Sequence, residues 1–229
     1  MGRGRGPRVF SLCGNFLKLG GFVHLGWREG LSEEERQAVV AETLELATAV
    51  DGRLIQLILF ADARIRFGHG GPADVYVAKV REAIALTQDS MDLGRLGTLN
   101  AALSHALGWA GLLHECLAAN DMALQASSSI DRFDRDFIGF DVRQWVLGIR
   151  LGILAALGRD GEASHCVELL LESIRPSDDP MISAIAHGGA VEVHSVAGRT
   201  GLAAQHAESL AGIARSYPSP YMNAYASFA

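Results

Sequence analysis

The chain has 229 residues, of which 49% are hydrophobic, and it carries a formal net charge of −6. This apolar content is enough for a continuous core and excludes a disordered chain, while the acidic balance disfavours binding to nucleic acid, which requires a basic surface. Three widely spaced cysteines, Cys13, Cys116 and Cys166, form no CxxC pair. They indicate a reducing, cytoplasmic setting rather than a disulfide framework.

The first ten residues are basic and rich in glycine. We interpret residues 1–10 as a disordered tail and residues 11–229 as one helical-repeat domain. Polar residues interrupt the stretch after the tail, so it lacks the apolar centre of a secretory signal. No run of about 18 apolar residues occurs, which argues against a membrane span. Binding of phosphate or RNA by Arg3, Arg5 and Arg8 is the alternative role for the tail.

A turn signal recurs through the chain at nearly regular spacing. Its glycines are Gly30, Gly70, Gly111, Gly158 and Gly198, at intervals of 40, 41, 47 and 40 residues. Periods of this size are typical of stacked helical hairpins. The sequence therefore predicts an all-α fold, a right-handed, tetratricopeptide-like solenoid of about five hairpins and a truncated sixth.

The second helix of each predicted hairpin shows the 3.6-residue spacing of apolar side chains. Ser32 and Glu35 have the spacing of a capping box, so the first of these helices should begin after Ser32. The next opens with Pro72, whose fixed φ suits a first helical turn. The apolar positions of these helices span 39–47, 77–87, 113–124, 167–174 and 203–214.

The first helices of the hairpins are more apolar than the second helices. A helix that is apolar on more than one face is packed on more than one side, as expected for the inner helix of a stacked pair. We place these helices at 54–67, 96–109, 142–157 and 181–196.

Two further segments interrupt the regular pattern. Residues 131–137 mix acidic and basic side chains, and we interpret them as part of a solvated loop that accounts for the interval of 47. A longer insertion of this kind is also typical of binding, which is the alternative. Residues 221–229 resemble the first turns of a sixth hairpin without its partner, which suggests a fragment.

Sequence signatures of catalysis and metal binding are weak. The chain has no GxxxxGK[ST] and no GxSxG motif, and its glycine-rich residues 67–72 follow a helix rather than a strand. His187 and His194 are seven residues apart, near Glu192, and a metal site there is the alternative to structural histidines. We predict no catalytic residue, no cofactor and no metal.

Three tryptophans, Trp27, Trp109 and Trp145, lie near helix ends or on apolar faces. Packing in the core is the favoured interpretation for each of them. The alternative is a groove, because concave solenoid faces use aromatic anchors. A small-molecule pocket between helices near Trp109 and Trp145 is a further hypothesis.

Several stretches are more specific than a general helical repeat. One of them reads Phe-Ile-Gly-Phe-Asp-Val-Arg-Gln-Trp at 137–145. Together they resemble the C-terminal tetratricopeptide-like repeat region of bacterial class III adenylate/guanylate cyclases, in which a cyclase domain and an AAA-type ATPase segment precede the repeats. Related repeats occur in large ATP-dependent transcription activators. The stretches are 25–35, 73–83, 102–111, 118–124, 133–148 and 219–221.

The resemblance implies a regulatory role and no enzymatic activity in this chain. The cyclase catalytic residues and the P-loop have no counterpart here, and Leu112 stands where the family has a polar or basic residue. We therefore expect a non-catalytic interaction module that binds a protein or peptide in its concave groove, or the cyclase and ATPase domains of a parent protein. A small-molecule-sensing domain of a transcription activator is the alternative. The partner-binding candidates are Arg64, Asn100, His105, Trp109, Arg143, Gln144 and Trp145.

Overall fold

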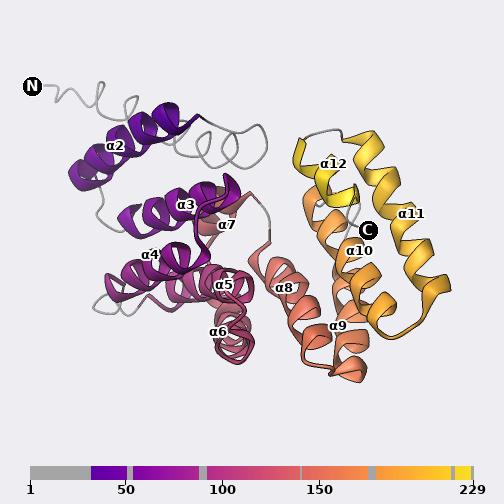
Figure 1. The fold of residues 1–229 in the computed structure, drawn as a ribbon. Helices are drawn as coiled ribbons and strands as arrows, with labels where there is room; N and C mark the ends of the chain where they lie inside the picture. The colour runs from indigo at the N-terminus through magenta and orange to yellow at the C-terminus, as the bar shows by residue number, and fades with distance from the viewer. Residues whose placement is uncertain are drawn as a thin grey trace, which may run out of the picture.

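Helices and the turns between them make up the part of the chain that the structure describes, and no strand is found in that part (Figure 1). This confirms the predicted all-α class. The computed structural model describes residues 32–50, 54–87, 92–139, 141–174, 179–217 and 220–227.

Consecutive helices pack against each other as hairpins. The four hairpins among the described residues are α3 with α4, α5 with α6, α8 with α9, and α10 with α11, and α2 packs against α3. The helices are α2 (Glu33–Val50), α3 (Leu54–Gly68), α4 (Ala73–Ala85), α5 (Leu93–Trp109), α6 (Leu113–Ala126), α7 (Arg132–Ile138), α8 (Val142–Ala156), α9 (Asp160–Ser173), α10 (Pro180–Val196), α11 (Thr200–Ser216) and α12 (Pro220–Ser227), with a short 3₁₀ turn at Ser127–Ser129.

The recurring glycines are the turns inside the hairpins. Gly70, Gly111, Gly158 and Gly198 have φ values of 88°, 74°, 68° and 68°, in the left-handed region that favours glycine. After each glycine, the next amide donates back to the preceding helix, for example from Arg159 to the carbonyl of Leu154 at 2.9 Å. This is the Schellman ending of a helix. The predicted repeat signal is thus confirmed at four of its five positions, and Gly30 lies outside the described residues.

The predicted helix starts are also found. The amide of Ser32 donates to Oε2 of Glu35 at 2.9 Å, and the amide of Glu35 donates to Oγ of Ser32 at 3.2 Å. This is the reciprocal capping box that the sequence predicts. Pro72 is the N-cap of α4, one residue earlier than the predicted position in the first turn.

The prediction of a solvated loop at 131–137 is wrong. Residues 132–138 form α7, whose N-cap Asp131 accepts from the amide of Asp134 at 2.8 Å and whose C-cap is Gly139. Asp134 is 1% exposed and forms a buried ion pair with Arg95 of α5. The extra helix lies in the insertion that lengthens one repeat interval to 47 residues.

The first helices of the hairpins are the inner ones, as predicted. They carry most of the buried side chains, and they approach their neighbours closely through glycine. A β-carbon at Gly148 would lie 2.3 Å from Cγ2 of Ile185, and one at Gly189 would lie 2.6 Å from Cδ1 of Leu151. Glycine at these two positions allows α8 and α10 to pack with little space between their axes.

A buried polar network fixes α8 on the α5–α6 hairpin. Nδ2 of Asn120 donates to the carbonyl of Val146 at 2.9 Å and to Oγ of Ser104 at 3.2 Å, while Arg150 donates to the amide oxygen of Asn120 at 3.0 Å. Asn120 is fully buried. Because unsatisfied buried polar groups are costly, this network specifies how α8 packs on the α5–α6 hairpin.

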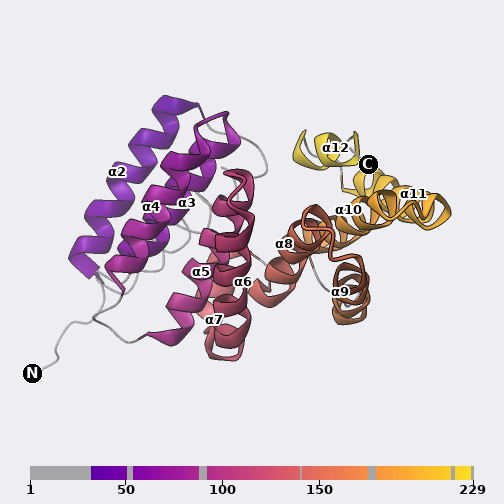
Figure 2. The same ribbon diagram turned by 60° about the horizontal axis from the view of Figure 1, so that its bottom comes forward.

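The helices fall into two groups. In both views α2 to α6 lie on one side of the molecule, and α8 to α12 lie on the other (Figures 1 and 2). The short helix α12 packs on α10 and α11, where the sequence predicts the start of a sixth hairpin. In the described part of the chain, no helix is long and apolar enough to cross a membrane.

Candidate functional site

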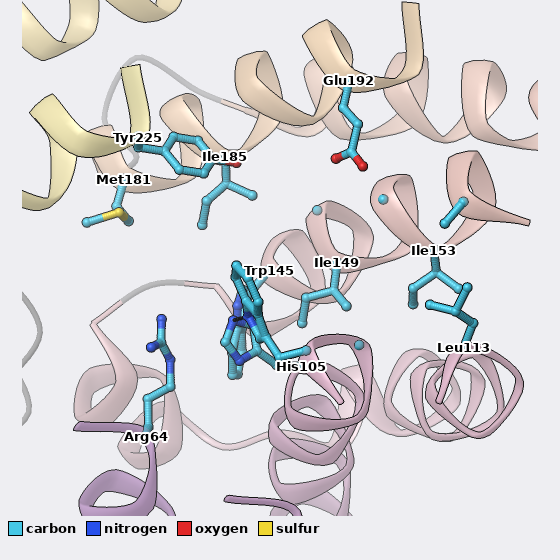
Figure 3. Close-up of a pocket in the computed structure, with 15 residues that line it drawn as sticks. Arg64, His105, Leu113, Trp145, Ile149, Ile153, Met181, Ile185, Glu192 and Tyr225 are labelled. Carbon is cyan, nitrogen blue, oxygen red and sulfur yellow. Dashed lines mark hydrogen bonds between the residues drawn. The ribbon is translucent and has the colours of Figure 1, made fainter. Parts of the chain in front are cut away.

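A pocket of about 340 Å³ lies where the two groups of helices meet. Its walls come from α3, α5, α6, α8, α10 and α12, so segments far apart in the sequence contribute to it (Figure 3). The lining is predominantly apolar. It consists of Arg64, His105, Gly108, Trp109, Leu113, Trp145, Gly148, Ile149, Gly152, Ile153, Ala156, Met181, Ile185, Glu192 and Tyr225.

Contacting aromatic rings form one side of the pocket. The ring of His105 lies 5.6 Å from that of Trp145 and 6.1 Å from that of Trp109, measured between centroids. Behind this layer, Tyr76 and Phe67 stack at 5.6 Å, and Phe67 contacts Trp109 at 5.5 Å. Such ring contacts fix orientation as well as burying area, so this wall is formed without a ligand.

His105 is neutral, and its tautomer is defined. Burial, followed by the positive charge of Arg64, holds the pKa of His105 well below its usual value. Nε1 of Trp109 donates to Nε2 of His105 at 3.1 Å, so the remaining hydrogen of the imidazole is on Nδ1. That atom is buried and makes no hydrogen bond to any described residue. Burial also raises the pKa of the Tyr76 phenol, so Tyr76 stays neutral.

Two side chains of opposite charge lie at opposite ends of the pocket. Arg64 reaches up from α3, and Glu192 reaches down from α10 (Figure 3). Glu192 lies at the rim, and the residue as a whole is more than a third exposed. Its carboxyl is partly buried, and this burial raises the pKa of the carboxyl. Its carboxylate lies over α8, since a β-carbon at Gly152 would be 3.3 Å from Oε2 of Glu192.

The structure brings four of the seven predicted partner-binding residues together in this pocket: Arg64, His105, Trp109 and Trp145. The other three do not line it. Nδ2 of Asn100 donates to the carbonyl of Leu96 at 2.8 Å, and Nε2 of Gln144 donates to the carbonyl of Ser173 at 2.9 Å, so both amides serve the fold. Arg143 is exposed and outside the pocket.

The two tryptophans that the structure describes differ in burial. Core packing is correct for Trp145, which is 3% exposed, and wrong for Trp109, which is 64% exposed although one of its edges contacts Phe67. Leu112, in the turn after Trp109, is 43% exposed, as the sequence predicts for that position. Trp27 lies outside the described residues.

Sequence reasoning missed the contribution of α10 and α12 to the pocket. Met181, Ile185 and Tyr225 all line it, yet their apolar spacing is also that of ordinary core residues. One available signal was Gly148 and Gly152, one helical turn apart on an otherwise bulky helix. Small residues with that spacing indicate a close approach from a neighbouring element.

A second group of titratable side chains lies between α10 and α11. Nδ1 of His187 and Nδ1 of His206 are 3.0 Å apart, and the ring of His194 stacks on that of His206 at 5.4 Å. Among the described residues, no group of three or more His, Cys, Asp or Glu side chains is arranged to hold a metal ion. Both described cysteines, Cys116 and Cys166, are buried free thiols whose pKa values burial raises.

Because of these three histidines, the protein should lose stability in mild acid. Burial lowers the pKa values of all three histidines. His206 lowers that of His187 further, and Arg199 and then His206 lower that of His194 further. The pKa of a histidine is about 6.5 in the unfolded chain. A histidine whose pKa is lower in the folded chain stabilises the fold above about pH 6.5, and this stability is lost as the pH falls. We expect the urea concentration at the unfolding midpoint to decrease as the pH is lowered from about 6.5 to 5. The decrease should be smaller in His206→Gln. An equal decrease of the midpoint in the native chain and in His206→Gln would contradict a role for these histidines.

Comparison with protein-family models, with curated proteins and with solved structures gives no match for this chain. The arrangement itself identifies an all-helical domain of helices packed in consecutive pairs. The resemblance to the repeat region of the cyclases stays a prediction.

Proposed function

We propose that this chain is a non-catalytic regulatory module that recognises a small, largely apolar ligand in the pocket between its two groups of helices. The observation that carries the proposal is the pocket itself, which brings together aromatic and apolar side chains from separate hairpins. Its volume of about 340 Å³ is within the range of about 300–1,000 Å³ that is typical of small-molecule sites.

The lining favours binding over covalent chemistry. The described residues that form it include no serine, threonine, cysteine or lysine. Its histidine is neutral and hydrogen-bonded to Trp109 rather than placed beside a nucleophile. Nucleophilic catalysis needs a nucleophile, a base and an orienting group in contact, and this lining offers the aromatic surface and polar ends of a binding site instead.

The position of the pocket suggests how binding would be transmitted. A ligand inside it would contact α3 and α5 of one group of helices together with α8, α10 and α12 of the other. Its binding energy would favour one relative orientation of the two groups. A ligand shifts such an equilibrium only by its differential affinity for the two states, and a site built from both groups provides that difference.

Filling the pocket should abolish ligand binding. Ala156 is exposed, lines the pocket and ends α8, so Ala156→Trp adds an indole to the wall without burying new polar atoms. The matched control is Ala204→Trp, at an exposed position of α11 outside the pocket. We expect saturation-transfer NMR with a panel of aromatic and aliphatic fragments to find ligands for the native chain and for Ala204→Trp. Ligands that bind Ala156→Trp equally well would place the site elsewhere.

A second candidate function is docking of a protein or peptide partner. It is favoured by the exposed side chains of Trp109 and Leu112, which lie close together at the turn between α5 and α6. Exposed aromatic residues are the usual anchors of such interfaces. In that case Leu112→Asp, at a position outside the pocket lining, would weaken capture of the partner, whereas the fragments above would still bind.

We further propose, from the sequence resemblance, that the output domain regulated by this module is a nucleotide cyclase or an ATP-dependent regulator. The test is the genomic sequence around this reading frame. A cyclase domain and a P-loop segment encoded upstream would support the proposal. A different domain in that place would contradict it, without affecting the pocket.

A further inference from the structure

The rim of the pocket formed by α8 and α10 carries negative charge. Glu192 has no ion pair or hydrogen bond to any described residue, and its carboxylate lies over Gly152. The last turn of α8, which includes Ile153 and Ala156, also lines this rim and contains no basic residue. Because the carbonyl end of a helix bears partial negative charge, carboxylate and helix end act together on a ligand at this rim.

Between the rim and the opposite end, the pocket surface is mainly apolar, with the neutral imidazole of His105 as a polar group in it. Ile185 and Met181 of α10 lie across this space from Trp145, and Ile149 lies beside Trp145 on α8 (Figure 3). A flat hydrocarbon or aromatic body fits such a surface.

The opposite end repels a second cation. Arg64 lies there, and its positive charge is felt in the pocket wall, because it contributes to the lowered pKa of His105. A ligand with an amine at each end would bring one of them to Arg64. A ligand with a single amine can place it at Glu192 and its apolar end toward Arg64.

We propose that the pocket binds an aromatic monoamine, with its ammonium group against Glu192 and its flat apolar body against Trp145. This inference rests on the proposed function, because it assigns a chemical class to the ligand of that same pocket. The unpaired carboxylate and the helix carbonyl end select the cation, and the indole wall selects the flat apolar body. The charge of Arg64 sets the orientation of the ligand in the pocket.

The test compares three probes that share an indole ring and differ in the charge of a short side chain at C3. Tryptamine is the cation, 3-ethylindole is its neutral analogue and indole-3-propionate is the anion. We expect isothermal titration calorimetry to give the tightest binding for tryptamine and the weakest for indole-3-propionate. In Glu192→Gln, the affinity for tryptamine should fall by roughly tenfold, since a charge-assisted contact is lost, while 3-ethylindole should bind as before. Glu208→Gln, at an exposed position of α11 outside the pocket, is the matched control.

The outcomes separate this inference from the proposed function. Equal affinities for the three probes, or an unchanged affinity for tryptamine in Glu192→Gln, would overturn the assignment to amines and leave the pocket as a ligand site. Failure of all three probes to bind the native chain would overturn both proposals for ligands of this size. Because Glu192 is at the rim and outside the core, circular dichroism should show the variant folded like the native chain.

Discussion

Replacing Asp134 with alanine should lower the free energy of unfolding by about 3–5 kcal/mol, because the buried guanidinium of Arg95 loses the carboxylate that it contacts through two nitrogens. Arg95 and Asp134 are 7% and 1% exposed. Nε of Arg95 donates to Oδ2 of Asp134 at 2.9 Å, and its NH2 group lies 2.8 Å from Oδ1. The same guanidinium donates to Oε1 of Gln56 at 3.3 Å, so the pair connects α7, α5 and α3.

Urea unfolding followed by circular dichroism measures this loss, and two controls define its cause. Glu115→Ala breaks the exposed pair with Arg81, which should change the unfolding midpoint little. The double variant Arg95→Met with Asp134→Leu removes both charges and should recover most of the stability, because an apolar pair of similar volume avoids the desolvation penalty. If Asp134→Ala unfolds at the same urea concentration as the native chain, the ion pair does not hold α7 in place.

Much of the fold could be predicted because local rules determine it. The left-handed turns at Gly111, Gly158 and Gly198 follow from a residue type that tolerates positive φ, and their spacing reveals the hairpins. The capping box at Ser32 and Glu35 is equally local. These features need no knowledge of distant contacts, so a single sequence contains them.

The features that sequence reasoning missed depend on contacts between distant segments. In the sequence, residues 131–137 alternate in charge like a surface loop, and only the fold brings Arg95, 39 residues away, against Asp134. The same holds for the pocket. His105 and Trp145 were predicted as candidates on polarity and aromatic character, but Glu192 and Tyr225 join them only because α10 and α12 pack against α8 and α11.

Replacing Trp145 with alanine should have the second large effect, on both stability and binding. Trp145 is 3% exposed and contacts Phe60 of α3 at 6.2 Å and His105 of α5 at 5.6 Å, between ring centroids. Removing this ring from the junction of the two groups of helices leaves a large cavity, and such truncations cost about 3–5 kcal/mol. The same ring forms a wall of the pocket, so affinity for any ligand held there should fall as well.

Loss of binding through unfolding must be separated from loss of the pocket wall. Trp145→Phe keeps an aromatic ring in the core but shortens the wall, so thermal unfolding should show a folded protein with a smaller loss of stability. Leu112→Asp provides the contrast, because its side chain is 43% exposed at the turn between α5 and α6 and does not line the pocket. Calorimetric titration at a temperature where all variants are folded then isolates the contribution of the wall. If Trp145→Phe binds fragments as tightly as the native chain while Leu112→Asp does not, the recognition surface is the exposed turn between α5 and α6, and the pocket is a packing feature of the junction.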